Sequence, residues 1–507
     1  MKLHVFFLMV ATFTFKYVSA QVVFLKNPIN TSMSDDFNPS VSGNGKTLLY
    51  EMIYWNTNKA DVMISYQVNG SWSVPVVVPG VNTQSETLTN GGYFINHAGN
   101  IILFHSNRFR GIGGTDIYYS EKNENGSWSA PINFGKPINS TGNELDPSIS
   151  PDGKFMFYTV LSDKKTPGGL PCGKIMMVER ISSTSWKEPV ALPSPINGDC
   201  ECGGKILSDG KTFLFSSMRA GGKGGYDFYK STRAENGSFS TPINYAFINT
   251  PNDDKYISIA AGGSMLYSDA PGKGKDERDV IIAKVPEDMQ PGMVKLYQGK
   301  VLDASTKKPL ASQITVTHIK TGFTMVYRTA ADGSFSVPVP ASDNYDVGIF
   351  PGQPGYEYAS FYDPKSPVSK YEEKNVSYEL KTVTKGSEIV LTPVFVDDSL
   401  ELDSKSELEL NRVKLLLKVN PTLSINILAY TNEIMLDSVK HSSYDKEIAT
   451  TVDSITTVSY SNDHSQEEAK VISDYLVKAG IPASRITYKG MGLNGEAPKK
   501  KYVLTVK

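Results

Sequence analysis

The sequence predicts a multidomain, mainly β protein with a β-propeller of five or six blades, a small β-sandwich and a C-terminal α/β domain. Three observations predict this: a unit of roughly 55 residues recurs five times, short alternating strands follow it, and helix and strand patterns mix near the end. The 507 residues also exceed what one hydrophobic core supports. We expect a signal peptide over 1–20, the propeller over 21–290, the sandwich over 294–385 and the α/β domain over 388–507.

The N-terminus has the three parts of a secretory signal peptide. Lys2 precedes an apolar stretch over 5–15, and a small-x-small pattern ends at Ala20. A membrane anchor is the alternative, but the stretch is short and Lys16 interrupts it. No later run is long enough to span a membrane. We therefore predict cleavage after Ala20, an exported chain and no transmembrane span.

Charge and cysteine usage restrict the partners and cofactors. The 51 basic and 53 acidic residues give a net charge of −2, so nucleic acid is not an expected partner. In an oxidising compartment Cys172 is expected to pair with Cys200 or Cys202, and free buried thiols are the alternative. The six histidines are scattered and none is near these cysteines, so we predict no metal site and no cofactor.

Five repeat units share a glycine turn followed by an apolar strand, with an aromatic residue five positions after the glycine. The glycines are Gly45, Gly99, Gly153, Gly210 and Gly262, and the aromatic residues are Tyr50, Phe104, Tyr158, Phe215 and Tyr267. A second strand follows in every unit, and in four of them an outer strand such as "NGSWSVP" and a turn containing asparagine come next. Three or four short strands per unit are typical of propeller blades.

The two ends of the repeat region complement each other. The fifth unit has no outer strand of its own, whereas residues 22–31, "VVFLKNPINT", are an outer strand and turn without a unit before them. The N-terminal strand is therefore predicted to complete the last blade, which removes exposed edges. This gives five blades, or six if residues past 290 contribute strands.

An aspartate begins the second strand in four units, at Asp61, Asp116, Asp227 and Asp279. These carboxylates could form a ring of ligands, but aspartate at this position more often caps a turn. We predict turn caps.

The repeats resemble the TolB-like, WD-type propeller repeats of exported bacterial proteins, through "SPDGK", "GGxDIY" and "GSWSxP" recurring in order. After the segment "PEDMQPGM", the strings "GKVLDASTKKPL" and "TAADGSF" resemble the carboxypeptidase regulatory-like β-sandwich. In that family the module serves as a spacer or an interaction domain, and the same role is implied here.

Helix and strand patterns alternate from residue 388 onward. The pattern predicts a helix beginning with a Ser404-x-x-Glu407 capping box and ending near Pro421. A second helix is predicted from Ser465 to Gly480, since apolar residues recur on one face. The Ser- and Thr-rich segment before it, residues 436–463, is predicted to be a mobile loop or an added strand pair.

This order, with "INILAYTN" between the helices and "AGIPASRITYKGMG" after them, resembles the OmpA C-terminal domain, with which Gram-negative outer-membrane proteins hold peptidoglycan. Together the three modules resemble exported OmpA-family proteins of the Bacteroidetes, some of which serve type IX secretion. The resemblance implies a ligand corner at Tyr430, Thr431, Asn432 and Glu468.

The charges of this corner differ from the family pattern. The family places an aspartate at the position of Asn432, facing an ammonium, and an arginine at the position of Glu468, facing a carboxylate. An amide lacks the charge that strengthens such a bond, and a glutamate repels a carboxylate. Losing a desolvated pair costs roughly 2–5 kcal/mol. The near-terminal lysines 499–501 could supply positive charge. We expect an altered, degenerate site.

No string of the chain predicts catalysis. Gly490-x-Gly492-x-x-Gly495 matches a dinucleotide fingerprint, but no helix is expected after it. We therefore predict that the chain is not an enzyme. The expected function is that of a periplasmic, outer-membrane-associated scaffold that docks envelope proteins; a cell-wall anchor that binds peptidoglycan is the alternative.

Overall fold

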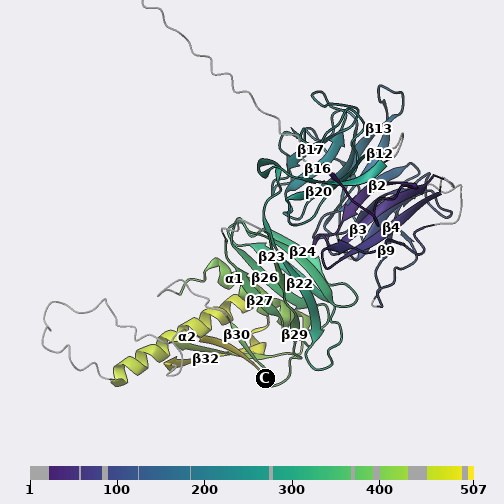
Figure 1. The fold of residues 1–507 in the computed structure, drawn as a ribbon. Helices are drawn as coiled ribbons and strands as arrows, with labels where there is room; N and C mark the ends of the chain where they lie inside the picture. Colours follow the sequence, from purple (N-terminus) through teal and green to yellow (C-terminus); the bar gives the residue numbers. More distant parts are fainter. Residues whose placement is uncertain are drawn as a thin grey trace, which may run out of the picture.

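The computed structural model describes residues 22–55, 59–82, 90–123, 125–182, 184–272, 278–366, 371–391, 400–431, 454–493 and 501–507. The predicted signal peptide lies outside these residues. Within them, no helix has the length and apolar character needed to cross a membrane. Figure 1 shows the propeller at one end, the sandwich in the middle and the C-terminal module at the other end.

Five sheets form the propeller, and each runs from an inner to an outer strand. The inner strands are β2 (Ser34–Val41), β7 (Asn90–Ile95), β11 (Glu144–Ile149), β15 (Glu201–Ile206) and β19 (Ile257–Ile259). The second strands are β3 (Thr47–Tyr54), β8 (Ile101–Ser106), β12 (Phe155–Lys165), β16 (Thr212–Ser217) and β20 (Met265–Pro271). The third strands are β4 (Lys59–Val68), β9 (Asp116–Glu121), β13 (Pro171–Glu179), β17 (Asp227–Thr232) and β21 (Arg278–Lys284). The outer strands are β1 (Val22–Phe24), β5 (Ser71–Trp72) with β6 (Val76–Val77), β10 (Ile132–Asn133), β14 (Val190–Ala191) and β18 (Ile243–Asn244).

The N-terminal strand completes the last blade, as predicted. β1 pairs antiparallel with β21, so that one blade joins the two ends of the repeat region. Ile29 is fully buried in a cluster with Leu48, Tyr50 and Val280. The mainly β, multidomain fold class is confirmed, and the blade number is five.

The asparagine in the turn that follows each outer strand has one repeated structural role. Its side chain accepts a hydrogen bond from, and donates one to, the backbone of a single residue near the start of a third strand. The pairs are Asn30 with Val280, Asn82 with Val62, Asn139 with Ile117, Asn197 with Ile175 and Asn249 with Phe228. An amide can do this because it carries a donor and an acceptor side by side.

The glycine turns are confirmed in four blades and corrected in the fifth. Gly45 has a φ of 69°, in the left-handed region that glycine adopts at little cost. In the fifth blade the residue with this conformation is Gly263, also at 69°, and not Gly262. The Gly263 amide donates to the Ala260 carbonyl, as Gly45 donates to Ser42. The turn therefore lies one residue later than the aromatic spacing suggested.

The four aspartates predicted as turn caps lie near the starts of the third strands of their blades, and all four are buried. They are Asp61, Asp116, Asp227 and Asp279. Asp116 accepts from the backbone amides of Ile112 and Gly113, and Asp227 accepts from those of Lys223 and Gly224. These two carboxylates hold the preceding loop, as the turn-cap prediction expected.

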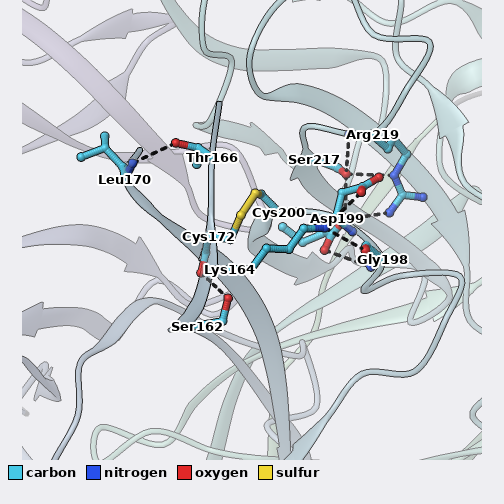
Figure 2. The surroundings of a disulfide bond; sticks show 11 residues. Ser162, Lys164, Thr166, Leu170, Cys172, Gly198, Asp199, Cys200, Ser217 and Arg219 are labelled. Atoms are coloured by element: carbon cyan, nitrogen blue, oxygen red, sulfur yellow. Dashed lines mark hydrogen bonds and ion pairs between the residues drawn. A yellow bond between two sulfur atoms is a disulfide. The ribbon is translucent and has the colours of Figure 1, made fainter. Parts of the chain in front are cut away.

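A disulfide joins Cys172 on β13 to Cys200, which immediately precedes β15 (Figure 2). It links the third blade to the inner strand of the fourth. Cys202 remains a buried free thiol, and burial raises its pKa. Nearby, the Lys164 ammonium lies 3.2 Å from the Asp199 carboxylate, so a second contact spans the same two blades.

The sandwich consists of two facing sheets around one core. The first contains β22 (Val294–Asp303), β25 (Ser334–Pro340), β28 (Glu372–Asn375) and β29 (Tyr378–Leu380). The second contains β23 (Ser312–His318), β24 (Thr324–Arg328), β26 (Tyr345–Pro351) and β27 (Ala359–Asp363).

The sandwich packs against the glycine turns of the propeller. Met325 lies against the turn at Gly210, and Tyr371 lies against Gly262. Lys46 forms a 2.7 Å ion pair with Glu373. The connecting segment, which contains the short 3-10 helix η1 (Glu287–Met289), is held as well, since Lys230 and Tyr245 donate to the Met289 carbonyl. The sandwich therefore covers one face of the propeller.

The C-terminal module has four strands and two described α-helices. Its sheet has the order β30 (Glu388–Leu391), β33 (Lys501–Val506), β31 (Ile425–Thr431) and β32 (Ile486–Leu493). The helices are α1 (Ser404–Val419) and α2 (Ser454–Lys478), and the 3-10 helix η2 (Ala483–Arg485) precedes β32. β31 and β32 are parallel, and β33 is antiparallel to β31.

Two predictions about these helices were wrong. The N-cap of α1 is Asp403, whose carboxylate accepts from the Ser406 amide at 2.6 Å, and Ser404 is already helical. α2 begins at Ser454 and not at Ser465. Residues 454–463 were predicted as loop or strand, but they contain no proline or glycine to stop the helix from extending. The rest of that segment lies outside the described residues.

The sandwich and α1 are joined by a buried ionic contact. Arg412 of α1 is 5% exposed and pairs with Glu409 of the same helix and with Asp346 of β26. The Tyr358 hydroxyl donates to Glu409 at 2.9 Å. Burial lowers the pKa of Arg412 to about 10 and raises the pKa of Glu409.

Candidate functional site

The predicted ligand corner lies at the end of β31. Tyr430 is half-buried, and its backbone is in register with Lys501 of β33. Thr431 is the last residue of the strand and is in register with Leu493 of β32. Asn432 and the lysines at 499 and 500 lie outside the described residues.

Glu468 is fully buried on α2 and points toward neighbouring side chains of its own module. Its Oε1 atom lies 3.3 Å from Nε2 of His464, one helical turn earlier. Burial raises the pKa of the Tyr502 phenol, and the charge of Glu468 and a hydrogen bond to it raise this pKa further. Tyr502 is in register with Ala429, next to the predicted corner. Glu468 therefore belongs to a buried polar cluster with His464 and Tyr502.

Two further helix residues fix the strand beside this cluster, and sequence reasoning missed them. The Ser465 hydroxyl accepts from the Gly492 amide at 3.0 Å, and the Gln466 side chain accepts from the Gly490 amide at 2.6 Å. These two glycines belonged to the apparent dinucleotide fingerprint. They lie within β32, where they bind α2 side chains and open no helix.

A second candidate site lies at the propeller mouth that faces away from the sandwich. Four inner strands have a register shift at the same point, and the residues there have a positive φ: Asn38 at 50°, Gly92 at 58°, Asp146 at 47° and Gly203 at 65°. Glycine takes this conformation at little cost, whereas Asn38 and Asp146 bring polar side chains to it. Non-glycine residues in such conformations cluster at functional sites.

Three buried titratable side chains, those of Glu51, His105 and Lys205, lie near these positive-φ residues. Asn38 donates to Oε1 of the buried Glu51 at 2.5 Å, and the Asp146 amide donates to Nδ1 of His105 at 3.1 Å. Nζ of Lys205 donates to the Ile257 carbonyl at 2.7 Å. Burial raises the pKa of Glu51 to about 8, lowers the pKa of Lys205 to about 8 and lowers the pKa of His105.

This mouth cluster, made of Asn38, Glu51, His105, Asp146 and Lys205, was not predicted. Its members come from four blades, so no local motif links them. The signal available in the sequence was Asn38 and Asp146 in place of the glycines of neighbouring units. In the part of the chain that the structure describes, no group of three or more His, Cys, Asp or Glu residues could hold a metal ion.

The mouth cluster predicts a pH dependence of stability. The folded-state pKa of Glu51 is raised to about 8 from 4.5, so the unfolded chain loses this proton first as the pH rises. The stability contributed by the protonated group is complete below pH 4.5 and declines as the pH rises toward 8. We expect Glu51→Gln to remove this decline. Urea unfolding at pH 5, 6.5 and 8 checks it, and parallel profiles for the two proteins would contradict it.

Comparison with known proteins finds similar solved structures but no matching family. No protein-family model and no curated protein matches the chain. Similar solved structures include the catalytic domain of a GH62 α-L-arabinofuranosidase from Coprinopsis cinerea, at 12% identity over 52% of this chain and 96% of that one, with a TM-score of 0.36. An α-L-arabinofuranosidase from Lactobacillus brevis has 13% identity over 52% and 94%, with a TM-score of 0.35. An OmpA-like domain from Francisella tularensis has 12% identity over 32% and 74%, with a TM-score of 0.18.

These matches correct the prediction that the chain is not an enzyme. That prediction is withdrawn, because glycoside hydrolases are among the solved structures similar to this chain. It rested on missing local motifs, whereas glycoside hydrolysis requires carboxyl groups that a fold brings together from separate strands. At these identities the likeness concerns the fold, and no substrate is carried over to this chain.

Proposed function

We propose that the protein is an exported scaffold of the OmpA family, associated with the outer membrane from the periplasm, that docks envelope proteins. The predicted signal peptide, the disulfide and the order of a TolB-like propeller, a regulatory-like sandwich and an OmpA-like domain support this proposal. Service in type IX secretion fits the same resemblance.

The packing of the three modules carries the proposal. The Gly292 amide donates to Asp209 at 2.7 Å, Lys46 pairs with Glu373, and Arg412 joins α1 to the sandwich. Such contacts hold the modules in one arrangement, and one face of the propeller is used for it. The opposite face, with the mouth cluster, is available to a partner, and we propose it as the docking surface.

Docking can be tested with a photo-cross-linking residue placed in cells at Lys255, which lines the open mouth, and at Lys46, on the face that the sandwich covers. The two lysine side chains are comparably accessible, at 35% and 47%. We expect a discrete envelope-protein adduct from position 255 and none from position 46. The same adducts from both positions, or none from either, would exclude the open mouth as the docking surface.

A peptidoglycan anchor is the alternative function. Glu468 is an acidic residue where the family uses a basic one, and it is already engaged with His464 and Tyr502. A buried carboxylate at this position repels the carboxylate of a peptide ligand. The geometry therefore favours the scaffold over the anchor.

Sedimentation of the full chain with purified sacculi separates the two functions. We expect the wild-type protein to stay in the supernatant. Asn432→Asp combined with Glu468→Arg is expected to increase pelleting, because the pair restores both charges of the family pattern. Glu468→Gln, which removes a charge without adding one, is the control. Wild-type pelleting would establish the anchor, and an unchanged double variant with a native circular dichroism spectrum would refute the corner assignment.

A further inference from the structure

A cleft of about 330 Å³ lies between the propeller and the sandwich. Blades two and three provide one wall, with Lys122, Asp152 and Arg180, and the sandwich provides the other, with Tyr327, Arg328 and Ser336. Ligand sites commonly occur at such junctions between modules, and this volume is at the lower end of their usual range.

Two guanidinium groups meet in this cleft from different modules. Burial lowers the pKa of Arg180, and the positive charge of Arg328 lowers it further, so the two cations are close enough to repel each other. Among the residues that the structure describes, neither side chain forms an ion pair. The charges of Glu121 and Asp152 act on Arg180 in the opposite direction, but neither forms an ion pair with it within the described residues, so the two cations favour an anion between them.

Two buried polar atoms of the lining also have no hydrogen-bond partner within the described part of the chain. They are Nε of Arg180 and Oγ of Ser336, one from each wall. Buried donors without partners are uncommon, because each costs the desolvation energy of the group. Both atoms can donate to an oxygen of a bound ligand.

The stacking of Arg180 on an aromatic ring recurs at the equivalent arginine of the next blade, but the larger cavity and the second arginine do not. Arg180 stacks on Trp186, with its guanidinium carbon 4.5 Å from the ring centre, and Arg233 of the next blade stacks on Phe155 at 4.4 Å. Both arginines have a buried Nε without a partner among the described residues. Arg233, however, lines a cavity of only about 20 Å³ that contains no second arginine.

The other charged groups of the cleft do not neutralise the arginine pair. Asp152 accepts from the Ser150 hydroxyl and the Lys154 amide of its own turn. Glu121 is exposed, and Lys122 lies over the Tyr66 ring at 5.3 Å. The three basic and two acidic side chains of the lining leave it positively charged.

We propose that this cleft binds the oxyanion of a small molecule, a phosphate or a carboxylate, between Arg180 and Arg328, with Ser336 donating a further hydrogen bond. Guanidinium groups recognise both oxyanions through paired N–H donors. Because the two arginines belong to different modules, the bound anion also strengthens the junction between propeller and sandwich.

Calorimetric titration and thermal unfolding of the full chain at fixed ionic strength test the proposal. Inorganic phosphate and succinate are the two probes, which separate the phosphate source from the carboxylate source, and sodium chloride is the blank. We expect one probe to bind at a single site and to raise the unfolding temperature. Chloride stabilising the chain as well as both probes would overturn the proposal, as would no binding of either.

Matched variants locate the site. Arg328→Gln is expected to weaken binding at least about tenfold, since one charge-assisted pair is lost. Arg328 is exposed, so this variant should fold. Arg180→Gln is expected to act in the same direction, and Arg233→Gln, at the equivalent position of the next blade, is expected to bind like wild type. Equal affinities for Arg328→Gln and wild type would place the anion elsewhere and contradict the proposal.

Discussion

Removing residues 22–31 is expected to open the propeller and to lower its stability more than any single substitution in a blade. These residues provide the outer strand of the last blade, the buried Ile29 and the amide of Asn30. Asn30 bonds to Val280, which is 250 positions away in the sequence, so the segment closes the ring. Ile29→Ala alone should cost about 2–5 kcal/mol, because the side chain is fully buried and leaves a cavity.

The comparison is between chains that begin at residue 21 and at residue 32, measured by thermal unfolding and limited proteolysis. Asn82→Ala is the control for Asn30→Ala, since both amides make the same pair of bonds but Asn82 bonds within neighbouring sequence. We expect Asn30→Ala to increase proteolysis across the blade that joins the two ends, and Asn82→Ala to act within its own blade. A truncated chain that unfolds at the temperature of the longer one would show that closure does not depend on this segment.

The repeated parts of this fold could be predicted because each blade has the same conformational and hydrogen-bonding requirements at the same positions. Gly45 and its counterparts need a positive φ, and Asn30 and its counterparts need a donor and an acceptor together, so the residue types recur at a fixed spacing. The fifth turn was misplaced because Gly262 and Gly263 are adjacent, and the sequence does not distinguish which one takes the left-handed conformation.

The candidate sites could be predicted only where a resemblance indicated residues. The position of Glu468 was expected, but its burial against His464 and Tyr502 depends on packing between α2 and β33. The mouth cluster depends on the blades meeting around one axis, so Glu51 and Lys205 both come near Asp146 without any spacing in the sequence. Likewise, the pairing of Arg180 with Arg328 follows from how two modules dock.

Lys295→Met is expected to destabilise the sandwich by about 3–5 kcal/mol, because it leaves a buried carboxylate without its cation. Lys295 and Asp363 are each only 2% exposed, and Nζ lies 2.8 Å from Oδ2. The Tyr297 hydroxyl donates to the other oxygen of Asp363 at 2.7 Å, and Nζ also donates to the Pro364 carbonyl. Burial and the contact with Asp363 raise the pKa of Tyr297, so this phenol remains a donor.

The double variant Lys295→Met with Asp363→Leu tests whether the stability lost in Lys295→Met comes from the missing ion pair or from the buried charge left unpaired. Replacing both partners by apolar groups removes the uncompensated charge, and the double variant should recover most of the lost stability. Lys307→Met, in an exposed pair with Glu379 at 2.5 Å, is the control and should cost less than about 1 kcal/mol. Urea unfolding measures all three. A double variant less stable than Lys295→Met would show that the pair stabilises the module beyond satisfying its own charges, whereas recovery would show that the cost of Lys295→Met comes from the unpaired Asp363 carboxylate.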